Sequence, residues 1–164
     1  IGLLDNVALS TEISVREAIQ RKLDDRTFDV GMLMDPIKDD EFTNELIGHF
    51  DLSLIGSRPT FDKDVEDYIL VDWGITFQKE HALYHKVTPN FKTSTAMIAL
   101  EVILSKGGFA YLPTELITQY LDSKELYEVE APVQIKRPIF MVYRKNNSNV
   151  ELISQFKNLL MIIQ

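Results

Sequence analysis

The sequence predicts an α/β protein made of two lobes that are joined by two long strands. Short apolar strand patterns alternate with helical patterns, which is typical of α/β folds with a largely parallel sheet. Two long strand patterns, 45–55 and 135–145, flank the middle of the chain. With 164 residues the chain is long enough for two closely associated lobes.

The first elements are expected to be a strand, a helix and a strand. Apolar and polar residues alternate over 7–14, which predicts a strand. Ser14 and Glu17 have the spacing of a capping box, in which each side chain satisfies a free backbone N–H group. This box would open a helix over 15–25, and the compact apolar run 28–34 predicts a buried strand with a right-handed crossover.

A connector, 56–67, is expected to lead into the second lobe. The later elements alternate in the same way, and Gly107-Gly108 should end a helix because glycine accepts a left-handed cap. The expected elements are strands at 68–73, 109–112 and 127–131, an irregular helix within 75–90, and helices at 96–105, 113–121 and 150–163, the last behind a Ser148–Glu151 capping box. The first lobe should comprise 1–55 plus 137–164, and the second lobe 56–136.

The charge of the chain argues against nucleic-acid binding by these residues. There are 25 acidic and 17 basic residues, a net charge of −8, which repels phosphate backbones. The basic pairs Lys136-Arg137 and Arg144-Lys145 have no aromatic residues between them, so we interpret them as solvated strand ends. The chain has no cysteine, which excludes disulfides and thiolate chemistry.

No membrane partner is expected either. The longest apolar runs have about five residues, as in 159–163, far short of a membrane span. The first residues have neither the basic region nor the apolar core of an export signal.

No group of residues predicts catalysis. His81 and His85 have the four-residue spacing of a metal-binding pair, but Ala82 stands where a zinc protease carries glutamate, so surface or capping histidines are preferred. The acidic run 39–41 fits a cation site less well than an exposed helix start. Phosphate-binding glycine loops and a G-x-S-x-G elbow are absent from the sequence. We therefore expect no enzyme, no metal and no cofactor.

A series of motifs runs in a defined order through most of the chain. They are the helix 15–23, Phe28-Asp29-Val30-Gly31-Met32-Leu33, the polar stretch Thr93-Ser94-Thr95, the apolar helix 96–106, Gly107-Gly108, Leu112-Pro113 and the return strand 138–145. This order resembles the effector-binding domain of LysR-type transcription regulators. Asp40-Glu41-Phe42, Val71-Asp72-Trp73-Gly74 and Phe77-Gln78 resemble the HdfR branch of that family.

The resemblance implies a type 2 periplasmic-binding-protein-like fold, in which two Rossmann-like lobes are hinged by two crossover strands. A small effector, such as a carboxylate, would bind between the lobes. Thr93, Ser94 and Thr95 would offer hydroxyls and the free N–H groups of a helix start; alternatively, Thr95 only caps its own helix. Asp35 and Pro36 would face the same cleft, and Trp73 would either line it or belong to the core.

The resemblance also implies partners and a location. DNA would be bound only through an N-terminal winged helix-turn-helix, which is absent from this chain, as are the first strand and first long helix of the family unless 1–6 represents them. A homodimer or tetramer in the cytoplasm is expected, with contacts through helix 15–25 and the long strands. The alternatives are a periplasmic-type solute-binding protein, an enzyme of this fold such as a deaminase or dehydratase, and a regulator that binds only proteins.

Overall fold

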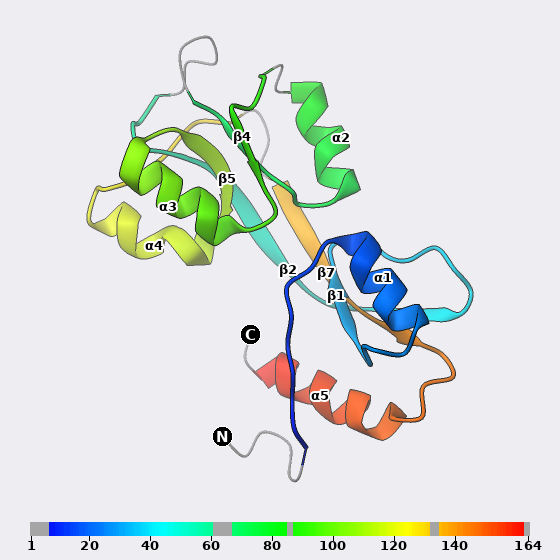
Figure 1. The fold of residues 1–164 in the computed structure, drawn as a ribbon. Helices are drawn as coiled ribbons and strands as arrows, with labels where there is room; N and C mark the ends of the chain where they lie inside the picture. The colour runs from blue at the N-terminus through cyan, green and yellow to red at the C-terminus, as the bar shows by residue number, and fades with distance from the viewer. Residues whose placement is uncertain (1–6, 61–66, 85–86, 132–134, 163–164) are drawn as a thin grey trace. The chain divides into compact units, whose positions relative to one another are not determined.

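The computed structural model describes most of the chain, namely residues 7–60, 67–84, 87–131 and 135–162. Within these residues the chain forms five α-helices and seven β-strands (Figure 1). This mixture confirms the α/β class that the sequence predicts. Among the described helices, none is long and apolar enough to cross a membrane.

The chain divides into two compact units. Unit 1 consists of Ile1–Gly48 and Pro138–Gln164, and unit 2 of His49–Arg137. The two long strands, β2 (Phe42–Gly56) and β7 (Ile135–Arg144), each begin in one unit and end in the other. The expected closure of two lobes on a ligand stays a prediction.

Unit 1 has helices on both faces of its strands. Its further elements are α1 (Arg16–Asp24), β1 (Gly31–Leu33) and α5 (Val150–Ile162). On β7, Val142 belongs to an apolar cluster with Leu23 of α1, whereas the adjacent Met141 packs with Ile153 of α5. Successive strand residues point to opposite faces, so α1 and α5 cover opposite faces of this part of the sheet.

Unit 2 contains the remaining elements. They are β3 (Ile69–Val71), α2 (Ile75–Tyr84), β4 (Phe91–Thr93), α3 (Ala96–Lys106), β5 (Phe109–Pro113), α4 (Thr114–Asp122) and β6 (Tyr127–Glu128). Its core is rich in aromatic side chains, and Phe77 and Phe109 are fully buried. Gly107, with a φ of 81°, follows α3 as the sequence predicts.

The expectation of a largely parallel sheet is wrong. The pairs β1–β7, β2–β5 and β2–β6 are antiparallel, and β3–β4 is parallel. An apolar run identifies a strand but does not encode the direction of its partner. Here the long strands carry the chain out of unit 1 and back, and their neighbours pair with them in antiparallel fashion.

Three local expectations are also wrong. Residues 7–14 form neither helix nor strand, because strand pairing needs a neighbour and none of the described segments pairs with them. The N-cap of α1 is Val15 and has no side-chain cap bond, so the Ser14–Glu17 box does not form. Residues 39–41 do not start a helix but turn into β2, where Asp39 Oδ1 accepts a bond from Glu41 N at 2.9 Å.

Candidate functional site

The polar stretch Thr93-Ser94-Thr95 lies where two parallel strands end. β3 and β4 pair with Val71 opposite Thr93, and Asp72 N donates to Thr93 O at 2.9 Å. Each strand leads into a helix, β3 into α2 and β4 into α3 (Figure 1). Two helix starts therefore lie at the same edge of this strand pair, the place where open α/β sheets bind ligands.

The start of α3 contains a buried hydroxyl without a partner among the described residues. Thr95 is the N-cap residue, with extended backbone angles, but its side chain makes no cap hydrogen bond. Its Oγ1 is buried and has no hydrogen-bond partner among the described residues. Thr93 Oγ1 instead accepts a bond from Thr95 N at 3.2 Å. The side-chain cap that the sequence suggested for Thr95 is therefore not formed. Whether a ligand uses the hydroxyl stays a prediction.

The start of α2 is different, because a carboxylate lies just before it. Asp72 Oδ1 accepts hydrogen bonds from Gly74 N at 3.0 Å and from Gln78 Nε2 at 3.1 Å. A carboxylate here interacts favourably with the positive end of the helix. Of the two neighbouring helix starts, only that of α2 thus has a carboxylate among the contacts described.

Trp73 lies in the core of unit 2. Its side chain is buried, its Nε1 donates to Tyr111 O at 2.9 Å, and its ring centroid is 5.5 Å from that of Phe50. These contacts fit the core interpretation of Trp73. Its role in lining a ligand site stays a prediction.

Asp35 and Pro36 lie in unit 1, after β1. Both of their carbonyl oxygens accept hydrogen bonds from Arg16, at 2.6 Å and 2.9 Å. Sequence reasoning missed Arg16, which is the first residue of α1. The predicted site residues therefore fall into two groups, Asp35 and Pro36 in unit 1 and the other four in unit 2.

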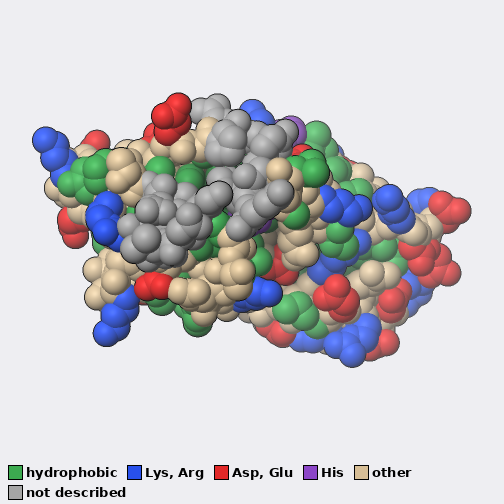
Figure 2. Space-filling view, turned by 90° about the horizontal axis from the view of Figure 1, so that it is seen from above, with side chains coloured by type: hydrophobic (Ala, Val, Ile, Leu, Met, Phe, Trp, Pro, Cys, Tyr) green, Lys and Arg blue, Asp and Glu red, His purple; other side chains and the backbone are tan. Residues whose placement is uncertain are grey.

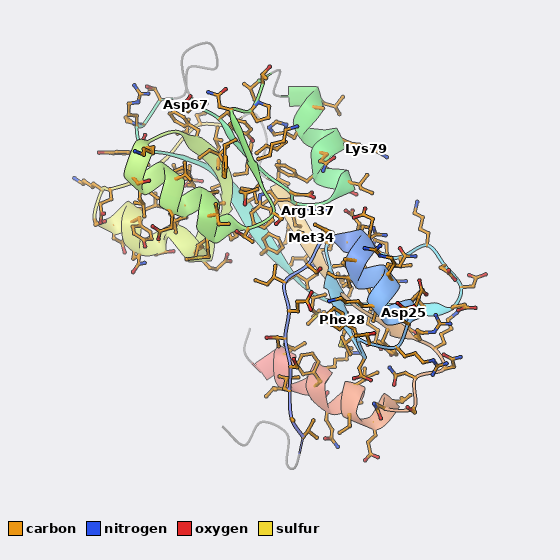
Figure 3. The ribbon with its side chains drawn as sticks, in the orientation of Figure 1. Asp25, Phe28, Met34, Asp67, Lys79 and Arg137 are labelled. Atoms are coloured by element: carbon orange, nitrogen blue, oxygen red, sulfur yellow. The ribbon has the colours of Figure 1, made fainter. Side chains whose placement is uncertain are left out.

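Arg137 was also missed, since the sequence suggested a solvated strand end. It is 2% exposed, and its Nε donates to Trp73 O at 3.1 Å. Figure 3 labels Arg137 on β7. The signal was the two-residue period of β7, which places Arg137 on the same face as the buried Ile135. Its positive charge lies beside the segment that leads from β3 to α2.

Arg144, from the second basic pair, is part of an ion-pair cluster. Arg144 contacts Asp24, at 2.9 Å, and Glu41, and its guanidinium lies 5.5 Å from the ring centroid of Phe42. On the face drawn in Figure 2, acidic and basic side chains are mixed rather than gathered by sign. The described side chains on that face therefore form no broad basic surface for a phosphate backbone.

His81 is a core residue rather than a surface or capping histidine. It is buried, and its ring centroid lies 5.2 Å from that of Tyr68 and 5.5 Å from that of Phe77. Burial raises the pKa of Tyr68 above its ordinary value and that of Tyr111 to about 12. His85 lies outside the described residues. Over the part of the chain that is described, His, Cys, Asp and Glu form no group of three that could hold a metal ion.

Comparisons with known proteins agree on one family. Residues 4–161 match the LysR substrate binding domain. The HTH-type transcriptional regulator HdfR of Salmonella schwarzengrund (strain CVM19633) is 27% identical over 143 residues, which are 86% of this chain and 50% of that protein. The chain thus spans about half the length of the curated relatives it matches.

Solved structures share the fold at low identity. DarR from Vibrio fischeri, in complex with DNA, has a TM-score of 0.76 and 14% identity over 93% of this chain and 57% of that chain. The regulatory domain of HypT from Salmonella typhimurium has a TM-score of 0.78 in its apo form, with 14% identity over 98% of this chain and 86% of that one. Its bromide-ion-bound form gives 0.73 and 15%, over 93% and 81%.

These neighbours have the type 2 periplasmic-binding-like α/β fold that the sequence predicts. The family match covers nearly every residue and agrees with the order of the motifs. The chain belongs to the LysR substrate binding domain family.

Proposed function

We propose that the chain is the effector-sensing domain of a LysR-type transcription regulator, and that the start of α3 binds an anionic group of its effector. The observation that carries the site is the buried Oγ1 of Thr95, which has no partner among the described residues. A buried polar group without a hydrogen bond is unfavourable by about 1–3 kcal/mol, so a ligand that donates or accepts a bond here gains affinity.

Two features favour an anion at this helix start, whereas the neighbouring Asp72 carboxylate opposes it. The first N–H groups of a helix have no intrahelical partner and carry partial positive charge. Ser94 is exposed, so the start of α3 is reachable from solvent. The buried cation of Arg137 contacts the carbonyl of Trp73, at the same edge of the β3–β4 pair. The bromide ion in the HypT regulatory domain shows that a protein of this fold holds an anion.

The site is tested with anions as probes, because the effector is unidentified. Sodium sulfate and sodium acetate are titrated into the chain while the amide resonances of 94–98 are followed by NMR. We expect these resonances to shift and saturate. Thr95→Val replaces the hydroxyl by a methyl group. This variant should raise the dissociation constant of the anion about tenfold, which corresponds to roughly 1.4 kcal/mol.

Thr118→Val is the matched control. Its hydroxyl donates to Thr114 O at 3.0 Å within α4, a different helix. The control should bind the anions as the native chain does. Equal binding by Thr95→Val and Thr118→Val would show that the ligand sits elsewhere, and the double variant Thr93→Ala with Ser94→Ala extends the test to the other two hydroxyls.

We further propose that the full protein binds DNA through a segment outside this chain and acts in the cytoplasm as a homodimer or tetramer. The regulators among its relatives support this, and they do not support a periplasmic solute-binding protein. The exposed faces of α1 and β2 would form the contact, and Leu46 of β2 is 51% exposed. Leu46→Lys should therefore shift sedimentation of the chain towards the monomer; an unchanged profile would contradict this interface.

A further inference from the structure

The edge where β3 and β4 end carries a negative charge beside the positive end of a helix. Asp72 directly follows β3, and Ser94 directly follows β4. Val71 lies opposite Thr93 in this parallel pair. Asp72 N donates to Thr93 O at 2.9 Å, which continues the pairing by one position. Because neighbouring strands lie about 4.8 Å apart, the backbone of Asp72 lies about one strand spacing from that of Ser94.

The carboxylate of Asp72 has one oxygen available to a ligand. Its Oδ1 accepts both hydrogen bonds described for the side chain, from Gly74 N and from Gln78 Nε2. Oδ2 has no partner among the described contacts. Val71 is buried, and successive strand residues point to opposite faces. The side chain of Asp72 therefore points away from the core, and both Asp72 and Ser94 are exposed.

The positive group is the start of α3. Ala99 N donates to Thr95 O at 3.4 Å, and the amides of 96–98 precede this bond, so they have no intrahelical acceptor. A second observation points to a ligand here, because Oγ1 of Thr95 is buried and has no partner among the described residues. Asp72 nevertheless lies on the neighbouring strand end and repels a simple anion.

We infer that the effector is a small α-amino acid, whose carboxylate binds the start of α3 while its ammonium group binds the available oxygen of Asp72. This inference rests on the proposed function and names the class of its ligand. In an α-amino acid both charges are attached to one carbon atom, so a single small molecule contacts both strand ends. The ammonium group turns the repulsion by Asp72 into attraction, because hydrogen bonds between ionised groups are stronger than neutral ones.

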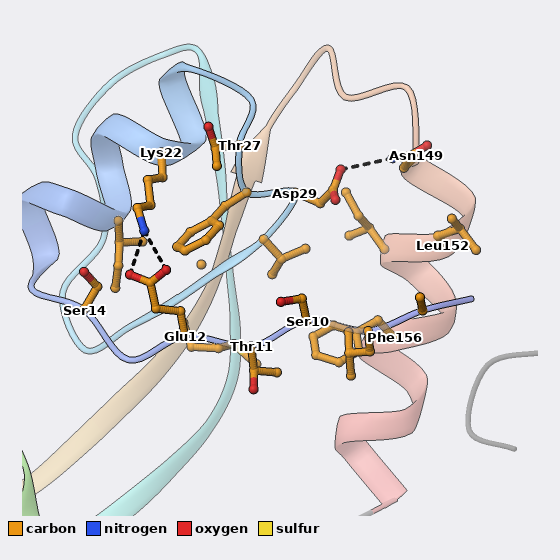
Figure 4. A pocket seen from close by; sticks show the side chains of 18 of the residues that line it. Ser10, Thr11, Glu12, Ser14, Lys22, Thr27, Asp29, Asn149, Leu152 and Phe156 are labelled. Atoms are coloured by element: carbon orange, nitrogen blue, oxygen red, sulfur yellow. Dashed lines mark hydrogen bonds and ion pairs between the residues drawn. The ribbon is translucent and has the colours of Figure 1, made fainter. Parts of the chain in front are cut away.

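The groove of about 730 Å³ in unit 1 does not offer the same combination of charges. Three segments line it, namely 7–14, 27–32 and the first turns of α5 (Figure 4). Lys22 donates to Glu12 at 2.6 Å, and Asn149 donates to Asp29 at 3.0 Å. The charged side chains described in its wall thus already have partners, so we expect an amino acid to bind unit 2 instead.

The test compares glycine with acetate, because the two molecules differ only in the ammonium group. Each is titrated into the chain near neutral pH and at constant ionic strength, and the amide resonances of 72–78 and 94–98 are followed by NMR. We expect both probes to bind, and glycine to bind about tenfold more tightly through one additional charged hydrogen bond. Equal affinities would overturn this inference alone, whereas no shift with either probe would refute the proposed anion site and this inference with it.

Asp72→Asn removes the charge but keeps an oxygen that can accept from Gly74 N and Gln78 Nε2. In this variant acetate should bind more tightly than to the native chain, because the repulsion is gone, and glycine should lose its advantage over acetate. A merely structural role of Asp72 would change both affinities in the same direction, which would overturn the inference. Glu101→Gln removes an equal charge from an exposed position of α3 and, as the matched control, should keep the preference for glycine.

Two further outcomes distinguish other ligands and other places. In 4-aminobutanoate the two charges are three carbon atoms apart, so this probe should bind less tightly than glycine. Tighter binding of 4-aminobutanoate would overturn the assignment to α-amino acids. Glycine-induced shifts confined to 7–14 and 27–32 would place the amino acid in the groove of unit 1, which also overturns the inference.

Discussion

The hydroxyl of Tyr143 on β7 donates a hydrogen bond to the carboxylate of Glu45 on β2. Lys157 of α5 donates to the other oxygen of the same carboxylate. These bonds lower the pKa of Glu45, with Lys157 as the larger cause, and the bond to Glu45 helps raise the pKa of Tyr143 to about 12. One carboxylate thus links two strands and the last helix of unit 1.

The first prediction concerns acid stability. A carboxylate whose pKa is lower in the folded chain stabilises it fully above the ordinary value of 4.5, and this stabilisation is lost as the pH falls through the folded pKa. Glu45→Gln should therefore be less stable than the native chain near neutral pH and should lose less stability on acidification. Urea unfolding at pH 3 to 7 measures this difference. Glu101→Gln, which changes an exposed carboxylate of α3, should show the same change of unfolding free energy with pH as the native chain.

The second prediction concerns the buried cation. Arg137→Ala would leave the carbonyl of Trp73 without this donor and open a cavity, so we expect a loss of about 2–4 kcal/mol of unfolding free energy. Lys136→Ala, at the exposed neighbouring position, should change it by less than about 0.5 kcal/mol. Similar effects for the two variants in chemical denaturation would mean that Arg137 contributes little to the core.

The third prediction compares Gly107 and Gly108, the two glycines that follow α3 in the sequence. Both have positive φ, but a Cβ on Gly108 would lie 2.6 Å from the carbonyl oxygen of Asp67, whereas one on Gly107 would meet the movable hydroxyl of Ser57 at 3.1 Å. Gly108→Ala should therefore be the more destabilising variant, by about 1–3 kcal/mol. Thermal unfolding of both variants tests the order, and a larger loss in Gly107→Ala would contradict it.

The fourth prediction separates the two threonines at the start of α3 without any ligand. Thr93→Val removes an acceptor of the Thr95 amide and should cost about 0.5–1.5 kcal/mol of stability. Thr95→Val removes a buried hydroxyl that has no described partner, so the unfolding free energy should stay the same or rise. A clear loss in Thr95→Val would mean that its hydroxyl is bonded in solution.

Much of the fold could be predicted because its signals are local. The apolar pattern of 96–105 and the glycines behind it correctly indicated α3, observed as Ala96–Lys106, and Pro113-Thr114 indicated α4. Whether two strands pair in parallel or antiparallel fashion could not be predicted, because pairing depends on segments that are distant in the sequence. Residues 7–14 have the pattern of a strand, yet no described segment pairs with them.

The site was harder to predict because its decisive features are tertiary. The hydroxyls of residues 93–95 are visible in the sequence, but whether Thr95 Oγ1 finds a partner among the described residues depends on packing. The burial of Arg137 follows from the period of β7, whereas its bond to Trp73 O spans 64 positions. Arg16 was missed because its acceptors are backbone oxygens, which carry no residue-specific signal.

Asp72 limits the number of anionic groups that can bind where β3 and β4 of unit 2 end. Its carboxylate occupies the α2 start through bonds to Gly74 N and Gln78 Nε2, so the polypeptide itself supplies the anion there. The α3 start has no such built-in counterion among its described contacts. Binding in unit 2 should accordingly follow a one-to-one isotherm, and a dianion with widely separated charges should gain nothing over a monoanion.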